Sequence, residues 1–438
     1  MNMHDDIINM DSIRAYKFRL YPDSKRQSEI NEHLILSQKL YNAILERAKK
    51  AYEKDKKSKV NKSTLNRYMK EAIIENKDFL KIYSQSRQDI FVRVQKAYQN
   101  FFNRVKKGVR GKKVGFPRFK SRDRYKSITY TQDNGSFSIE KDRLRVSRIG
   151  TMKIELHRNI EGRIKTLTIK KDAGKYYAIF TTSMERAVPK IKDTSPIGID
   201  MGLTTFAMFS DGTRLEKPKF ARKKERKIAH WQRVIAKKDE VAKKRKYNKY
   251  TKNRRKAVIR LQEVWVEVNN QNNDFIQKET TKMVDSGNYT SFKMENLQPQ
   301  NMMKNHNLAR SIGEASWSRF RQILSYKAES AGMKVNLVDA ADTTQECSDC
   351  HNVKKEEEKL TLKDRTYHCS ICGLVMDRDL NAARVINYRP ILEKAREGHS
   401  RRNAFGGVGS TIQRGLQTTP VNQEHTLQHS VAGEAHTL

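Results

Sequence analysis

Residues 342–350 read D-T-T-Q-E-C-S-D-C, and residues 367–387 read Y-H-C-S-I-C-G-L-V-M-D-R-D-L-N-A-A-R-V-I-N. Together they hold all four cysteines of the 438-residue chain, in two C-x2-C pairs with 18 residues between them: Cys347 and Cys350, then Cys369 and Cys372. A C-x2-C turn presents two thiolates on one side, and two such turns can surround one ion tetrahedrally. The spacing therefore predicts one structural Zn²⁺ bound by these four cysteines.

Two carboxylates, Asp377 and Asp379, follow the second cysteine pair at the start of a predicted helix. A site with four protein ligands is closed and has no open position for a substrate. We therefore interpret the cysteines as a brace that positions the helix and a carboxylate on it. The function of that carboxylate must then be inferred from residues elsewhere in the chain.

The chain is strongly basic, with 89 Lys and Arg residues against 50 Asp and Glu and a net charge of +39. Such an excess opposes compaction unless a polyanion offsets it, and each neutralised phosphate releases counterions, so nucleic acid is the expected partner. No run of 18 apolar residues is present, and the N-terminus M-N-M-H-D-D does not resemble a signal peptide. We therefore expect a soluble, cytoplasmic protein with no membrane partner, whose cysteines bind metal rather than form disulfides.

The first half of the chain predicts a β-barrel interrupted by helices. Residues 12–22 alternate between two faces and end at Pro22, as in a strand. Apolar residues then recur at helical spacing in three segments between residues 23 and 107. Six short strand-like runs follow, with turn signals between them, and complete an antiparallel barrel over residues 108–190: Ser127–Thr131, Ser136–Ile139, Leu144–Val146, Met152–Leu156, Ile164–Ile169 and Tyr176–Thr182.

Two segments are unusually basic, and each has two interpretations. Residues 108–122 read G-V-R-G-K-K-V-G-F-P-R-F-K-S-R, and glycines and a proline exclude a regular helix there. Such a loop either follows a phosphate backbone, with its aromatic residues as anchors, or is simply a basic loop. Residues 217–260 carry K-K-E-R-K, K-K-R-K and R-R-K on two predicted helices. They are either solvated faces or, as their density favours, a nucleic-acid contact.

The second half predicts short strands, two of which carry a carboxylate. Ile197–Asp200 is an apolar strand ending in a carboxylate, residues 203–209 form a second strand, and Ser291–Leu297 is a later strand that carries Glu295. A helix over 312–331 and a strand at Lys334–Val338 lead to the cysteines, and residues 395–438 have the composition of a disordered tail.

Asp200, Glu295 and Asp379 stand at the ends of apolar elements, where an unpaired charge is costly. Each alone would be a cap or turn residue. Together, a strand with Asp, a hairpin, a later strand with Glu and a helix with Asp describe an RNase H-like core. Three such carboxylates at one sheet edge can hold two Mg²⁺ ions about 3.5–4 Å apart for phosphodiester hydrolysis.

The combined motifs resemble the TnpB family of transposon-encoded, RNA-guided DNA nucleases, which are relatives of type V CRISPR effectors. The resemblance spans about residues 12–390 and rests on the following segments: I-G-I-D-M-G-L, K-M-E-N-L, T-T-Q-E-C-S-D-C, C-S-I-C-G, D-R-D-L-N-A-A-R-V-I, K-F-R-L-Y-P, K-A-Y-Q-N-F-F, G-F-P-R-F-K and L-A-R-S-I-G-E-A-S-W-S-R-F.

This resemblance implies an α+β multidomain fold. A wedge-type antiparallel β-barrel (12–22 and 108–190) would hold an inserted helical recognition unit (23–107). An RNase H-like (RuvC) α/β nuclease domain (195–342 and 376–392) would hold a zinc-binding insertion (343–375). It also implies that the RuvC metal ligands are Asp200, Glu295 and Asp379, with Asp377 as a cap or supporting residue.

The resemblance further implies a prokaryotic endonuclease that is a monomer with its guide RNA, encoded by the transposon end, and that cleaves double-stranded target DNA beside a short flanking motif. Gln88 and Thr131 are candidate readers of that motif, or plain surface residues. One departure is His351, which stands where the family has Gly after the second cysteine and strains the turn if its φ is positive. Two alternatives remain: an RNA-guided DNA-binding repressor without cleavage, and an unguided transposase or recombinase on an RNase H-like core.

Overall fold

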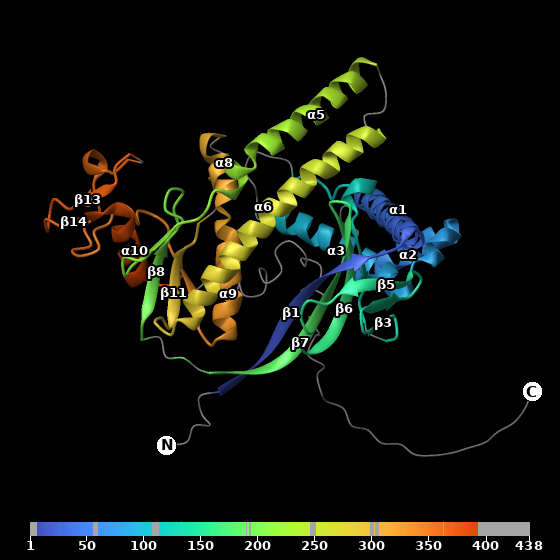
Figure 1. The fold of residues 1–438 in the computed structure, drawn as a ribbon, viewed down its shortest axis with the longest axis horizontal. Helices are drawn as coiled ribbons and strands as arrows, with labels where there is room; N and C mark the ends of the chain where they lie inside the picture. The colour runs from blue at the N-terminus through green and yellow to red at the C-terminus, as the bar shows by residue number, and fades with distance from the viewer. Residues whose placement is uncertain are drawn as a thin grey trace, which may run out of the picture.

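The computed structural model describes residues 7–392, apart from several short gaps: 56–59, 107–113, 133, 190, 192–193, 246–250, 298–301, 303–305 and 362. The predicted tail at 395–438 and most of the glycine-rich part of the basic loop therefore lie outside the described residues. Two sheets form the centres of two lobes, each with its own helices (Figure 1). Within the described part of the chain, no helix has the length and apolar character needed to span a membrane.

The first lobe contains a seven-stranded antiparallel sheet with the order β2-β6-β7-β1-β5-β4-β3. Its strands are β1 (Ile7–Tyr21), β2 (Ser127–Tyr130), β3 (Phe137–Glu140), β4 (Arg143–Val146), β5 (Gly150–Glu155), β6 (Arg163–Asp172) and β7 (Lys175–Pro189). The sheet curls far enough for the hydroxyl of Tyr130, in the edge strand β2, to donate to the carbonyl of Ser147, just after β4, at 2.9 Å. β1 begins at Ile7, earlier than predicted, because β7 continues to Pro189 and pairs with it.

Three helices lie between β1 and β2, as predicted: α1 (Ser24–Lys54), α2 (Lys62–Glu75) and α3 (Ser84–Lys106), with the short η1 (Lys77–Lys81) between the last two. Their apolar stripes share one core with the sheet, from Ile30 and Leu40 of α1 to Phe101 of α3 and Phe180 of β7. A buried ion pair, Arg93–Asp89 at 2.6 Å, joins α3 to β2, because Arg93 also donates to the hydroxyl of Thr129 at 2.9 Å.

The second lobe contains a five-stranded sheet with the order β10-β9-β8-β11-β12. Its strands are β8 (Pro196–Asp200), β9 (Ala207–Phe209), β10 (Arg214–Leu215), β11 (Ser291–Glu295) and β12 (Lys334–Val338). β8, β11 and β12 are parallel, whereas β9 runs antiparallel to both of its neighbours, β8 and β10. The strand predicted over 203–209 is too long, because β9 begins only at Ala207. Before it the chain turns, and the Gly202 amide donates to the Phe206 carbonyl at 3.2 Å.

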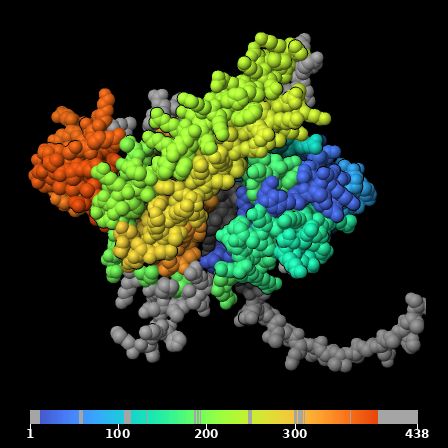
Figure 2. All heavy atoms as spheres, viewed as in Figure 1, coloured from blue at the N-terminus to red at the C-terminus, as the bar shows by residue number. Residues whose placement is uncertain are grey.

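The helices of this lobe are α4 (Phe220–Lys223), α5 (Glu225–Lys244), α6 (Lys252–Asp285), α8 (His306–Ala315), α9 (Trp317–Ser330) and α10 (Arg378–Tyr388). α5 and α6 form a long hairpin that reaches the first lobe (Figures 1 and 2). There Arg255 pairs with Asp123 at 3.6 Å. Between β12 and α10 lies a small element with η3 (Glu356–Glu358) and the hairpin β13 (Thr366–His368)–β14 (Val375–Asp377).

α10 lies directly against β8, and a glycine permits the contact. A Cβ atom at position 198 would overlap the carbonyl oxygen of Ala383 and lie 2.7 Å from the amide nitrogen of Asn387. Lys293 of β11 fixes the end of the same helix by donating to the carbonyl of Asn387 at 2.5 Å. No methyl group therefore fits between strand β8 and helix α10 at this point unless one of the two elements moves.

We expect Gly198→Ala to destabilise the second lobe by about 1–3 kcal/mol, the usual cost of overpacking. Chemical denaturation followed by tryptophan fluorescence measures this, because Trp231, Trp265 and Trp317 all belong to the second lobe. Gly313→Ala is the matched control, since a Cβ at that helical position meets nothing within 4 Å. Equal stability of the two variants would contradict the close-packing argument.

A carboxylate site beside a four-cysteine cluster

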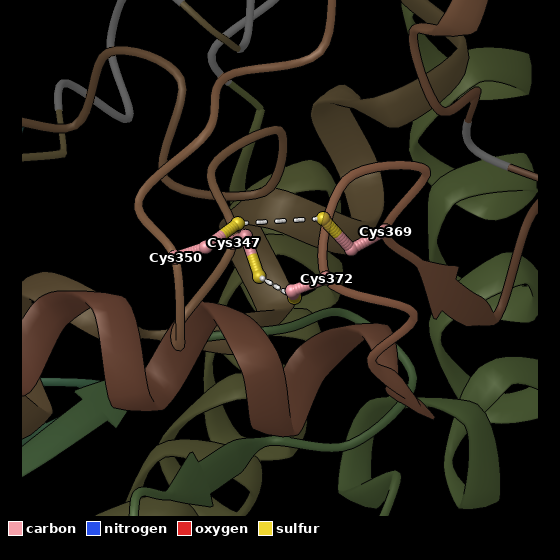
Figure 3. A group of neighbouring side chains, drawn as sticks. All are labelled: Cys347, Cys350, Cys369 and Cys372. Atoms are coloured by element: carbon pink, nitrogen blue, oxygen red, sulfur yellow. Dashed lines mark hydrogen bonds between the residues drawn. The ribbon is translucent and has the colours of Figure 1, made fainter.

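The four cysteines converge as their spacing predicts (Figure 3). Their sulfur atoms all lie within 4.8 Å of one another, with Sγ–Sγ distances of 3.6 Å for Cys347–Cys372 and 3.5 Å for Cys350–Cys369. A tetrahedral ion with metal–sulfur distances of 2.3 Å requires sulfur atoms about 3.8 Å apart. The cluster thus fits a single tetrahedral metal ion with all four positions filled by thiolates.

His351 adopts the strained backbone that the sequence suggested. Its φ is +60°, and Gly373, at the equivalent position after the second cysteine pair, has a φ of +76°. The His351 ring packs against Tyr388 with 4.3 Å between ring centroids, and its Nδ1 lies 4.0 Å from a Glu346 oxygen. The imidazole thus packs against Tyr388 of α10 and lies beside the Glu346 carboxylate.

Two of the three predicted carboxylates lie side by side. Asp200 ends β8 and Glu295 ends β11, and these parallel strands are in register through Ile199 and Met294. Both side chains are at the carboxyl edge of the sheet, and each residue is only 9% exposed. Asp379, in the first turn of α10, completes the trio because α10 lies across β8.

The electrostatics of the trio reflect this closeness. Burial raises the pKa of Asp200 well above its ordinary value, and the charges of Glu295 and Asp379 raise it further, whereas Arg378 opposes the shift. Burial also raises the pKa of Glu295, although the hydrogen bond from Thr343 and the charge of Arg389 act against it. Buried like charges of this kind favour a bound cation. The oxygen donors suit a hard divalent ion such as Mg²⁺.

The residues around the trio orient it. The Thr343 hydroxyl donates to Glu295 Oε1. The Asp377 carboxylate caps α10 by accepting from the amides of Asp379 at 2.9 Å and Leu380 at 3.1 Å. Asp377 is therefore the helix cap, as expected, and holds the turn that carries Asp379.

The cysteine segment is joined to α10 by a second set of contacts. Asn381, fully buried, donates to the Glu346 carbonyl at 2.7 Å and accepts from the Ser348 amide at 2.9 Å. The Glu346 carboxylate in turn binds the Arg389 guanidinium and the Tyr388 hydroxyl at the far end of α10. The segment that leads from β12 into the first cysteine pair is thus hydrogen-bonded to α10 both near its start and at its end.

Thr343, Glu346, Asn381 and Arg389 were not predicted as site residues. Three of them occur in the quoted motifs T-T-Q-E-C and D-L-N-A-A, but the spacing of these polar residues carries no metal or catalytic signal. Their positions within the motifs were the only indication, because the contacts they make cross between distant segments.

Gln88 and Thr131 lie on neighbouring segments of the first lobe. Gln88 is exposed on α3, and Thr131, partly buried, follows β2. The Gln85 side chain, one turn before Gln88, donates to Asn134 at 2.8 Å and accepts from the Gln132 amide at 3.2 Å. The pair is therefore close enough in the fold to act at one surface, and its reading of DNA stays a prediction.

Three family models match parts of the chain. A model described as "Cas12f1-like, TNB domain" matches residues 317–386, and OrfB_IS605, described as "Probable transposase", matches residues 179–306. A "Helix-turn-helix domain" model of the same OrfB_IS605 series matches residues 10–57. In the structure that last segment consists of most of strand β1 and the single long helix α1.

Two relatives match nearly the whole chain. "Putative RNA-guided DNA endonuclease InsQ" of Escherichia coli K12 is 27% identical, over 86% of this chain and 92% of its own. "Putative RNA-guided DNA endonuclease" of Streptomyces pristinaespiralis is 28% identical, over 88% of this chain and 94% of its own.

A solved structure shares the fold. The protein in "Cryo-EM structure of the Cas12f1-sgRNA-target DNA complex" superposes with a TM-score of 0.51 at 10% identity, covering 87% of this chain and 100% of its own. The two proteins therefore share an α+β fold with a curled antiparallel sheet. The OrfB_IS605 models and the two endonucleases that match nearly the whole chain support its membership of the TnpB family.

We expect Cys369→Ser to lower the bound zinc from about one ion per chain to near zero, because a closed tetrahedral site needs all four thiolates. Elemental analysis of the purified full-length protein measures the metal. His351→Gly is the control, since glycine accepts the positive φ at that position without strain. Full zinc content in Cys369→Ser would refute the four-thiolate site.

We expect Asn381→Ala to keep its zinc but loosen the cysteine segment from α10. Two partly buried backbone groups lose their partners, at up to about 1–3 kcal/mol each. Hydrogen–deuterium exchange over residues 343–375 and 378–388 should become faster, while the curled sheet of the first lobe should be unaffected. Unchanged exchange in these two segments would show that Asn381 does not dock them.

Proposed function

We propose that this protein is an RNA-guided endonuclease that cleaves double-stranded DNA next to a short flanking motif. The observation that carries the proposal is the convergence of Asp200, Glu295 and Asp379 at one sheet edge, in a TnpB-family chain of net charge +39. A chain that only bound nucleic acid would have no use for two buried carboxylates beside a third, partly buried one, because such like charges cost stability unless a cation binds them.

The proposed domain division follows the sequence motifs. Residues 12–22 and 108–190 form a wedge domain, with the helical recognition unit 23–107 inserted in it. Residues 195–342 and 376–392 form a RuvC-type nuclease domain, with residues 343–375 as a zinc-binding insertion. The arrangement of the two sheets and their helices is consistent with this division.

In the proposed site, Asp200, Glu295 and Asp379 would hold two Mg²⁺ ions. When bound, such ions activate a water and stabilise charge on the leaving oxygen during phosphodiester hydrolysis. The protein's own part is to hold the three carboxylates in place: Thr343 by its bond to Glu295, and Asp377 by capping the turn that carries Asp379. The four cysteines would bind one structural Zn²⁺ and support α10 from outside.

The proposed partners are a guide RNA and target DNA, bound by a monomer of the protein. α5 and α6 support this, because both helices are rich in Lys and Arg and extend between the lobes. Phosphate contacts of this kind give affinity without sequence preference. We propose Gln88 and Thr131 as readers of the flanking motif, since a Gln side chain can bind adenine through two hydrogen bonds.

We expect Asp200→Ala to lower the rate of DNA cleavage at least 100-fold, since the loss of one charge-stabilising group in other active sites costs ~10²–10³ in rate. Binding of RNA and DNA should persist. The measurement is a cleavage assay with the copurified ribonucleoprotein, alongside a gel-shift assay. Asp274→Ala is the control, because Asp274 is an exposed residue of α6 paired with Lys278. Cleavage at the wild-type rate in Asp200→Ala would refute the catalytic assignment.

The two alternatives differ from this proposal in what they require. A guided repressor would bind the target and leave it intact with wild-type carboxylates. An unguided transposase or recombinase would act on DNA after its RNA is removed by ribonuclease. Sequencing the RNA that copurifies with the protein, and then testing cleavage with and without it, separates all three.

A further inference from the structure

Arg378 places a guanidinium group inside the carboxylate site. Its Nη2 and Nε lie 3.1 and 3.3 Å from the same oxygen, Oδ1 of Asp379. Its Nη1 donates to the carbonyl oxygen of Thr361, in the cysteine-bearing insertion, at 3.1 Å. The side chain is only 12% exposed and makes three contacts, so this largely covered attachment differs from an ordinary surface ion pair.

Other cations near the trio have different partners. Arg389 is bound to the Glu346 carboxylate and to the carbonyls of Asp339 and Ala341. Lys293 donates to carbonyls at the end of α10. In the segments that the structure describes, the one ion pair to Asp200, Glu295 or Asp379 is that of Arg378, whose charge also acts on Asp200.

We propose that Arg378 is the built-in counter-cation of the carboxylate site: it stabilises the trio when no divalent ion is bound and competes with that ion for Oδ1 of Asp379. The inference rests on the proposed metal-dependent nuclease function. It assigns Arg378 a positioning and charge-compensating role, distinct from that of the three carboxylates themselves.

The choice of arginine follows from the geometry. A guanidinium can donate to a carboxylate through two nitrogens and to a carbonyl through a third, because its donors are spread in a rigid plane. A lysine would keep the charge but could not hold Asp379 and Thr361 in this fixed arrangement. The Thr361 contact also joins the insertion to the site, so that docking of the insertion sets the position of the counter-cation.

The test measures Mn²⁺ binding to the full-length protein with its copurified RNA, using the electron paramagnetic resonance signal of free Mn²⁺. The Mn²⁺ bound by the Asp200→Ala variant is subtracted, which removes the contribution of ions bound to the RNA. We expect Arg378→Met to bind the Asp200-dependent Mn²⁺ about tenfold more tightly, the effect of removing one neighbouring cation. Without metal, the same variant should melt at a lower temperature than wild type. Added Mn²⁺ should remove this difference in melting temperature.

Two further variants make the result specific. Arg214→Met is the matched control, since Arg214 pairs with Oδ2 of Asp377 at 3.0 Å, outside the trio, and its Mn²⁺ affinity should equal that of wild type. Arg378→Lys keeps the charge and should fall between wild type and Arg378→Met. It carries the test if Arg378→Met cannot be isolated without metal.

Equal or weaker Mn²⁺ binding in Arg378→Met would overturn the counter-cation role, because a residue that only orients Asp379 weakens metal binding when it is removed. A wild-type protein with no more bound Mn²⁺ than Asp200→Ala would instead refute the metal site of the proposed function. The two failures are therefore distinguishable in one set of titrations.

Discussion

The contact between strand β8 and helix α10 determines the geometry of the whole site. Asp200 ends the strand and Asp379 begins the helix, 179 residues later in the chain. Only a glycine at position 198 lets the backbone of the helix approach the strand this closely. The contacts of Lys293, Asn381 and Glu346 secure the same helix from its end and from its outer side. A shift of α10 would therefore change the spacing of the carboxylates before it changed anything else.

Closeness of like charges has a cost, and the surrounding residues offset part of it. The hydroxyl of Thr343, the cap at Asp377 and the guanidinium of Arg378 each satisfy one member of the trio or the turn that carries it. Two of these three, Asp377 and Arg378, belong to the motif D-R-D, and Thr343 belongs to the segment before the first cysteine. The cysteine element is thus linked to the carboxylates by hydrogen bonds. A structural metal there acts on the site through those bonds.

The α5–α6 hairpin carries part of the strong positive charge of the chain. Lys and Arg residues are frequent in α5 and at the start of α6, and this hairpin spans from the second lobe to the first, where Arg255 meets Asp123. A chain with 89 basic residues would repel itself in such an extended element without a polyanion nearby. Helix α10 and the β13–β14 hairpin lie at the end of the second lobe that faces away from the first lobe (Figure 1).

Local patterns in the sequence were sufficient for the two cysteine pairs, the three helices before β2 and the strands that carry Asp200 and Glu295, because each depends on spacing within a short segment. The strand with Glu295 was predicted to continue to Leu297, whereas β11 ends at Glu295. The start of β1 at Ile7 and the shortening of β9 could not be predicted, because strand length is set by a distant partner strand. For the same reason, only the tertiary structure revealed that Thr343 binds Glu295, that Asn381 docks the cysteine segment and that Arg378 enters the carboxylate site. The sequence by itself determined which residues can do the chemistry. The packing of α10 on β8 decided which of them meet, since long-range contacts depend on how whole elements fit together.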